Sequence, residues 1–106
     1  MRELWFMDRY GDEIEENITV EAIGHLLRTI AVPDGDDEHR AIAVCDSDGW
    51  NLEYYPDSVR FDNVQTPEEV GWLRGLNHQE RIALADELIH GDFNALRSRP
   101  WGAPHS

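Results

Sequence analysis

The residues best suited to acid–base chemistry in this sequence are three carboxylates around a predicted hairpin. Asp46, Asp48 and Glu53 lie in and just after the turn signal Asp46-Ser47-Asp48-Gly49. Two carboxylates that face each other in a cleft can act as the acid and the base of a hydrolase, but aspartates in a hairpin turn commonly serve the turn itself. No nucleophile elbow or glycine-rich phosphate loop accompanies them. We therefore predict no catalytic residue.

The five histidines do not have the spacing of a metal site. No two of them stand four residues apart, and the chain contains neither an HExxH motif nor a pair of cysteines. We predict no bound metal and no other cofactor. A small metal-dependent hydrolase that uses Asp46, Asp48, His39 or His90 stays open as an alternative.

The acidic run that begins at Asp34 has the composition of a calcium loop without its pattern. The full twelve-residue pattern, with a glutamate at position twelve after a central glycine, is absent. Turn chemistry and charge indicate a solvated loop after Pro33. Its acids are therefore candidates for contact with a partner rather than for metal binding.

Charge is the strongest feature of the composition. The chain has 22 acidic and 9 basic residues, a formal net charge of −13, and every basic residue is an arginine. Such a field repels a phosphate backbone and an anionic membrane surface, so we predict neither nucleic acid nor membrane as a partner. It attracts a basic protein and accelerates their association. An acidic surface also serves solubility alone, and that alternative stays open.

Aromatic residues follow the same hairpin turn. Because side chains alternate between the two faces of a strand, Tyr55 must point away from Trp50 and Tyr54, on the side of Asn51 and Glu53. Tyrosine with acidic neighbours is typical of hot spots for a basic partner, although packing within the sheet would place the same residues there. The predicted partner-binding residues are Asp34, Asp36, Asp37, Glu38, Asp46, Asp48, Glu53, Tyr55 and Asp57.

The first third of the chain is expected to hold a strand and a helix. The apolar run 4–7 predicts a buried strand, and residues 12–17 form an acidic turn or a short returning segment. Thr19 can cap a helix that ends before Pro33. Its apolar stripe repeats at helical spacing and consists of Val20, Ile23, Leu26, Leu27 and Ile30.

Three further strands are predicted at 41–44, 50–55 and 59–62. The turn at Gly49 and a second turn at Pro56-Asp57 separate them, which gives an antiparallel meander. Cys45 adjoins the first of these apolar runs, and we interpret it as a small core residue. As the only cysteine, it cannot form a disulfide within the chain.

The last third is expected to be helical. The signature Thr66-Pro67-Glu68-Glu69 predicts a short helix that Gly75 ends. A second helix follows, with a capping box from 77 to 80 and an end at 91. A third short helix begins at 92, and the tail from 99 to 106 is expected to be loose apart from a tryptophan at 101.

These elements predict one α+β domain over 1–106 with the order β-α-β-β-β-α-α-α. Short turns between strands favour a mainly antiparallel sheet of about four strands, with the helices packed on one face in a two-layer arrangement. No segment reaches the length of a membrane span, and the N-terminal residues 1–5 do not have the pattern of a signal peptide. We therefore expect a cytoplasmic protein.

Two segments carry a resemblance to a known kind of protein. The first is the hairpin DGWNLE at 48–53, and the second runs from LIHGD at 88–92 to PW at 100–101. Both are similar in style to short proteins of that kind. In size, charge and lack of a catalytic set, the chain resembles the small acidic immunity proteins of bacterial toxin systems. The resemblance covers about the C-terminal two-thirds of the chain and implies a protein that covers the basic active surface of a partner, such as a nuclease toxin. No binding residue carries over from it.

Two other functions remain open beside the hydrolase. Ordered acids can imitate the spacing of phosphates, which would make the chain a mimic of DNA or a regulatory subunit. Alternatively, a sheet edge or exposed aromatic residues can pair by symmetry in a homodimer.

Overall fold

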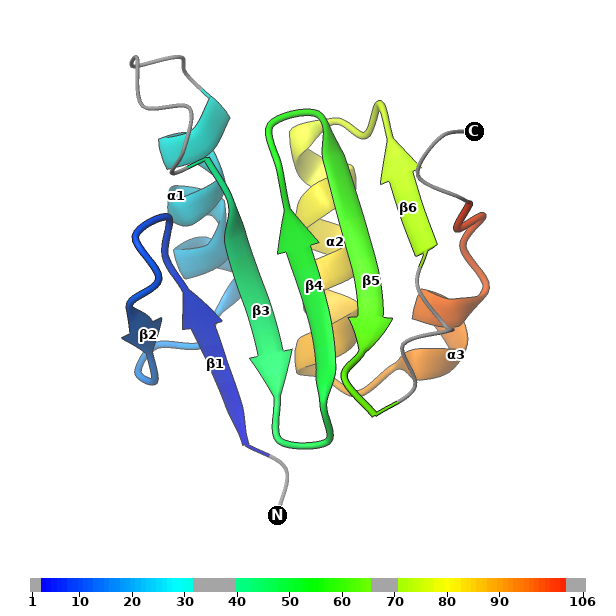
Figure 1. The fold of residues 1–106 in the computed structure, drawn as a ribbon, viewed down its shortest axis with the longest axis horizontal. Helices are drawn as coiled ribbons and strands as arrows, with labels where there is room; N and C mark the ends of the chain where they lie inside the picture. The colour runs from blue at the N-terminus through cyan, green and yellow to red at the C-terminus, as the bar shows by residue number, and fades with distance from the viewer. Residues whose placement is uncertain (1–2, 32–39, 66–70, 103–106) are drawn as a thin grey trace.

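A six-stranded antiparallel sheet with helices on one side forms the body of the protein. The computed structural model describes residues 3–31, 40–65 and 71–102. The described helices lie behind the sheet in the view of Figure 1, and every pair of neighbouring strands is antiparallel, in the order β2-β1-β3-β4-β5-β6. The strands are β1 (Leu4–Met7), β2 (Glu13–Ile14), β3 (Ile42–Asp46), β4 (Trp50–Tyr54), β5 (Ser58–Asn63) and β6 (Gly71–Arg74), and the helices are α1 (Val20–Ala31), α2 (His78–Ile89) and α3 (Phe93–Arg97).

The predicted α+β class with an antiparallel sheet and packed helices is confirmed. The sheet is larger than expected, because the acidic segment after β1 returns as β2 and because Gly71–Arg74 pairs with β5. The chain then crosses through α1 and re-enters the sheet at β3, on the opposite side of β1 from β2. From β3 to β6 the strands follow one another in sequence order, as a meander.

Helix α1 forms where capping and periodicity coincide. The Thr19 hydroxyl accepts a hydrogen bond from the backbone amide of Ala22 at 3.2 Å, which satisfies one of the free amides at the helix start. Ile23, Leu27 and Ile30 are buried, as the helical spacing of the apolar stripe predicted.

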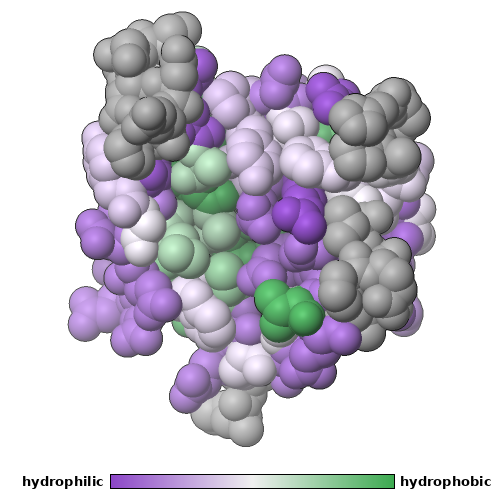
Figure 2. Space-filling model, in the orientation of Figure 1, coloured by the Kyte–Doolittle hydropathy of each residue, from purple (hydrophilic) through white to green (hydrophobic). Residues whose placement is uncertain are grey.

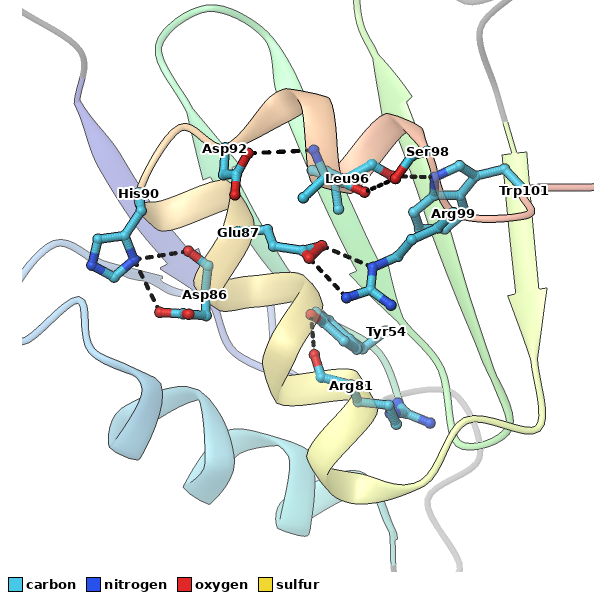
Figure 3. Close-up of polar contacts among 11 residues, drawn as sticks. Tyr54, Arg81, Asp86, Glu87, His90, Asp92, Leu96, Ser98, Arg99 and Trp101 are labelled. Carbon is cyan, nitrogen blue, oxygen red and sulfur yellow. Dashed lines mark hydrogen bonds and ion pairs between the residues drawn. The ribbon is translucent and has the colours of Figure 1, made fainter.

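Helices α2 and α3 also begin at the predicted caps. The Asn77 side chain accepts from the amide of Glu80 at 2.8 Å, and the Glu80 carboxylate accepts from the amide of Asn77 at 3.0 Å, which completes a capping box. The Asp92 carboxylate accepts from the amide of Ala95 and caps α3 (Figure 3).

The helix expected to end at Gly75 is wrong for residues 71–74, which are strand β6. Its signature at 66–69 lies outside the described residues. Pairing with β5 satisfies the backbone groups of β6, and Gly71 allows Trp101 to lie directly against the strand, since a Cβ at Gly71 would be 2.5 Å from the Cβ of Trp101. Tertiary contacts therefore overrule the local helix signal here.

The core lies between the sheet and the helices. Its sheet side includes a row of directly paired residues across the central strands, Phe6, Val44, Leu52 and Phe61, all buried. The remaining buried core residues are Ile23, Leu27, Ile30, Ile42, Tyr54, Val59, Leu84, Ala85, Leu88 and Leu96.

Polar contacts join α2 to the sheet and to the C-terminal segment (Figure 3). The buried Tyr54 hydroxyl donates to the carbonyl of Arg81 at 2.8 Å. Arg99 donates through Nε and Nη2 to the two oxygens of Glu87, at 2.8 and 2.7 Å, and the Trp101 indole donates to the carbonyl of Leu96. Residues 99–102 therefore belong to the packed body, in which the sequence had placed only Trp101 of the expected tail.

None of the helices within the described ranges has both the length and the hydropathy needed to cross a bilayer.

Candidate binding surface

The side of the sheet turned away from the helices is solvent-facing and defines the candidate site. Side chains of directly opposed residues in antiparallel strands share a face. One such row on this side crosses all six strands, and consists of Glu13, Met7, Ala43, Glu53, Arg60 and Trp72. A second row consists of Trp5, Cys45, Asn51 and Asp62. We call these ten residues, together with Tyr55, the open face.

The open face is divided into an apolar and a polar half. Over β1 and β3 it presents Trp5, Met7, Ala43 and Cys45, and Figure 2 shows this apolar area next to a hydrophilic area over β4 and β5. The hydrophilic area contains Asn51, Glu53, Arg60 and Asp62. The alternation along each strand thus gives one apolar face to the core and a mixed face to solvent.

A ladder of polar contacts fixes the hydrophilic half. The Tyr55 hydroxyl donates to Glu53 Oε2 at 2.8 Å, and its ring stacks on Trp72 with centroids 5.6 Å apart. The Arg60 guanidinium lies 3.2 Å from Asp62 and 3.9 Å from Glu53. Burial, followed by the hydrogen bond to Glu53, raises the pKa of Tyr55 to about 12, so its hydroxyl stays a donor at neutral pH.

The edge formed by β1 and β2 is acidic. Glu13 lies opposite Met7 in the register, and exposed Glu3 and Glu15 line a pocket of about 310 Å³ together with Trp5. An aromatic residue thus lies among carboxylates at this edge. The accessible carboxylates on and beside the open face, which we call the acidic rim, are Glu3, Glu13, Glu15 and Glu53, whereas Asp62 is buried against Arg60.

A larger pocket of about 380 Å³ opens on the same side of the sheet. Met7, Ala43 and Cys45 line it from the apolar half, and Asn51 and Glu53 line it from β4. Burial, followed by the negative field of Glu53, raises the pKa of the Cys45 thiol to about 11. The thiol is therefore neutral at physiological pH.

The structure brings together only part of the predicted partner-binding set. Glu53 and Tyr55 are in contact on the open face. Exposed Asp48 and Asp57 lie in turns at opposite ends of β4, and the acidic run 34–38 lies outside the described residues.

Asp46 has a structural role in the turn between β3 and β4. It is 2% exposed, and its Oδ1 accepts from the amides of Asp48 at 3.0 Å and Trp50 at 2.9 Å. A side chain so enclosed is unsuited to direct contact with a partner, and we leave it out of the proposed surface.

The residues of the hydrolase alternative do not assemble into a site in the described part of the chain. His90 is exposed at the end of α2, where its Nδ1 lies 2.9 Å from Asp86, and His39 is outside the described residues. Within the described ranges, no three His, Cys, Asp or Glu side chains are grouped so that they could hold a metal ion.

Sequence reasoning missed the apolar half of the open face. The run 4–7 suggested a wholly buried strand, whereas only Phe6 is fully buried and Trp5 and Met7 face outward. Cys45 is buried as predicted, at 5% exposure, but lies on the open face and not in the core between the layers. Consecutive apolar residues hide the two-residue period of a strand, so the signal for this half was absent.

No protein-family model matches the chain, and no curated protein or solved structure is significantly similar to it.

Proposed function

We propose that this chain is a binding protein of the inhibitor or immunity type, without catalytic activity, which covers a basic surface of a protein partner in the cytoplasm. The observation that carries the proposal is the open face, a side of the sheet that none of the described helices covers, with an apolar half and an acidic rim. The occupant to which we commit is a protein segment that combines arginine or lysine with apolar side chains.

The apolar half supplies the binding energy in this proposal. Burial of apolar surface contributes roughly 25 cal/mol per Å², and tryptophan and methionine are enriched at the centres of interfaces. Trp5 and Met7 are half-buried in the free chain. They therefore keep surface to bury against a partner and are already held in place by the sheet.

The acidic rim selects the partner. The four carboxylates of the rim outnumber the guanidiniums of Arg9, Arg60 and Arg74 on this side of the described structure, where Arg60 is already paired with Asp62. The whole chain carries a net charge of −13. A second copy of the chain would bring like charges together, which costs free energy. A mimic of DNA would not need Trp5, Met7 and Ala43 between its acids. Charge complementarity thus favours a basic protein.

A designed peptide pair tests the proposal. The probe is a soluble peptide of alternating arginine and leucine, and its counterpart replaces each arginine with citrulline, which keeps the shape and removes the charge. We expect the arginine peptide to bind and the citrulline peptide to bind far more weakly. Added salt should weaken binding of the arginine peptide. Amide signals of Met7, Ala43 and Glu53 should shift in nuclear magnetic resonance spectra.

Two double variants of equal charge separate the open face from the net charge. Glu13→Gln with Glu53→Gln removes two acids from the face, whereas Glu21→Gln with Asp86→Asn removes two exposed acids from α1 and α2. The first should weaken peptide binding about tenfold or more, and the second less than about twofold. Equal losses, shifts confined to the helices, or a dimer that covers the open face in sedimentation would contradict the proposal.

The immunity-type role has its own test in cells. If the product of a neighbouring gene is toxic, co-expression of this chain should restore growth, and the double variant of the open face should restore it less than the helix control. Absence of a toxic neighbour, or protection that is indifferent to the open face, contradicts the immunity-type role.

A further inference from the structure

The pocket of about 380 Å³ on the open face has the form of a receptor for one long side chain. The turn after β1, with Asp8 and Arg9, borders it on one side, and Glu53 of β4 borders it on the other. Met7, Ala43 and Cys45 contribute apolar surface between them. A group that fits must therefore be apolar along its length and polar at one end.

The charged residues around the pocket differ in how far they are already engaged. Asp8 Oδ1 accepts from the amides of Tyr10 and Asp12, at 2.9 and 3.0 Å, and so serves the turn. Arg9 donates through Nη1 to the carbonyl of Thr29 in α1 at 2.6 Å. These contacts tie both residues to the fold.

Glu53 is the carboxylate best placed to receive a ligand. Its Oε2 accepts from the Tyr55 hydroxyl, whereas the nearer partner of Arg60 is Asp62 at 3.2 Å and Glu53 Oε1 is 3.9 Å away. The long contact to Arg60 is weaker than a hydrogen-bonded ion pair. Glu53 thus presents negative charge at the border of an apolar pocket whose only thiol is neutral.

We infer that this pocket receives an arginine or lysine side chain of the partner, with its aliphatic stem on Met7, Ala43 and Cys45 and its cationic head at Glu53. The inference rests on the proposed function for the partner, but the pocket is tested without it. Long basic side chains combine a methylene stem with a charged end, which matches this arrangement of surfaces.

A small probe tests the pocket directly. N-acetyl-arginine methylamide and its lysine, citrulline and norleucine analogues are titrated into the labelled protein, and the amide signals of Ala43, Cys45 and Glu53 are followed. The arginine or lysine compound should shift them in a saturable manner, and comparison of the two identifies the preferred head group. Norleucine, which keeps the stem alone, and citrulline should each bind about tenfold more weakly or worse.

Two substitutions and their controls give the decisive comparison. Ala43→Leu fills the pocket, and Glu53→Gln removes the charge while it keeps an acceptor for the Tyr55 hydroxyl. Each substitution should weaken binding of the cationic probe about tenfold. Ala43→Ser, which leaves the space open, and Asp86→Asn on α2 should change affinity less than about twofold. Circular dichroism and the unfolding midpoint verify that each variant is folded.

The outcomes distinguish this inference from the proposed function. If the arginine–leucine peptide binds the open face but Ala43→Leu and Glu53→Gln leave affinity unchanged, the pocket is not a receptor and the proposed function stands. If the small probe saturates the pocket while the peptide does not bind, the pocket stands and the proposed function fails. In a double-mutant cycle, Glu53→Gln should remove the discrimination between arginine and citrulline; additive effects overturn the inference.

Discussion

At the scale of single residues, Cys45 shows how the open face controls chemistry. Burial and the nearby carboxylates raise its pKa from the ordinary value of 9.0 to about 11. The folded chain therefore holds the thiol proton more tightly than the unfolded chain does. The contribution of this difference to the free energy of unfolding is fully present below pH 9 and is lost as the pH rises toward 11.

We predict that the Cβ carbon signal of Cys45 titrates with a midpoint near pH 11 in the folded protein. The same signal in denaturant should titrate near 9, because the unfolded chain exposes the thiol. A native midpoint at or below 9 would show that the thiol is ionisable and reactive, and that the pocket is not apolar there.

The turn between β3 and β4 offers a matched pair of aspartates. Asp46→Ala leaves two amides in a nearly enclosed turn without their acceptor, and should lower the free energy of unfolding by about 1–3 kcal/mol. Asp48→Ala, at an exposed position in the same turn, should change it by less than about 0.5 kcal/mol.

Urea unfolding measures both variants of this turn. Asp46→Asn keeps the side-chain carbonyl and should recover most of the loss. Equal effects of Asp46→Ala and Asp48→Ala would mean that general charge, and not the turn hydrogen bonds, is responsible.

The residue scale is where sequence reasoning was least complete. Glu53 and Tyr55 lie on the face of β4 that the sequence predicted for them, because polar residues alternate there with the core residues Leu52 and Tyr54. Asp46 was grouped with them, since a sequence does not tell a carboxylate that shapes a turn from one that faces solvent. Trp5 and Met7 went unnoticed, because the apolar residues Leu4 and Phe6 beside them hide the two-residue alternation of the strand.

At the scale of elements, capping residues gave the starts of the described helices, although the helix expected to end at Gly75 was wrong for residues 71–74. Each of the three described helices begins after a polar residue whose side chain accepts a hydrogen bond from a backbone amide; these residues are Thr19, Asn77 and Asp92. Strand β6 was not foreseen, because its contact with Trp101 and its bridge to Gly102 join it to a segment that is distant in sequence. Local propensity has no access to such contacts.

Two glycine substitutions test this dependence on tertiary packing. Gly71→Ala should be destabilising by about 1–3 kcal/mol, because its Cβ would overlap Trp101 at 2.5 Å. Gly24→Ala in α1 should be stabilising by about 0.5–1 kcal/mol, since its Cβ would meet only ordinary contacts at 3.6 Å and alanine favours a helix.

Chemical unfolding gives the two free energies, and hydrogen exchange of the Trp72 and Gly102 amides reports on the bridge between β6 and the C-terminal segment. Exchange should accelerate in Gly71→Ala alone. A neutral Gly71→Ala would mean that Trp101 is not held against the strand.

At the scale of the whole molecule, the charge should limit stability. The net charge of −13 means that folding brings many carboxylates together, and ion pairs at the surface, such as Arg60 with Glu53, offset little of this. Salt screens the repulsion over a Debye length of about 10 Å at 0.1 M.

We therefore predict that moderate sodium chloride raises the free energy of unfolding, on the order of 1 kcal/mol, while it weakens binding of the arginine peptide. Urea unfolding and peptide titration in the same buffers measure both effects. Stability that falls with salt would indicate that attractive ion pairs dominate, and would remove the premise that the chain is primed for a cationic partner.

The four tryptophans are shared equally between the two sides of the sheet. Trp50 and Trp101 pack against Phe61 on the helical side, and Trp5 and Trp72 lie on the open face. The fluorescence of Trp50 and Trp101 should therefore respond to loosening of the core. The fluorescence of Trp5 and Trp72 should respond to a molecule that binds the open face. When phenylalanine replaces the two tryptophans on one side, the fluorescence of the remaining pair reports on only one of these two events.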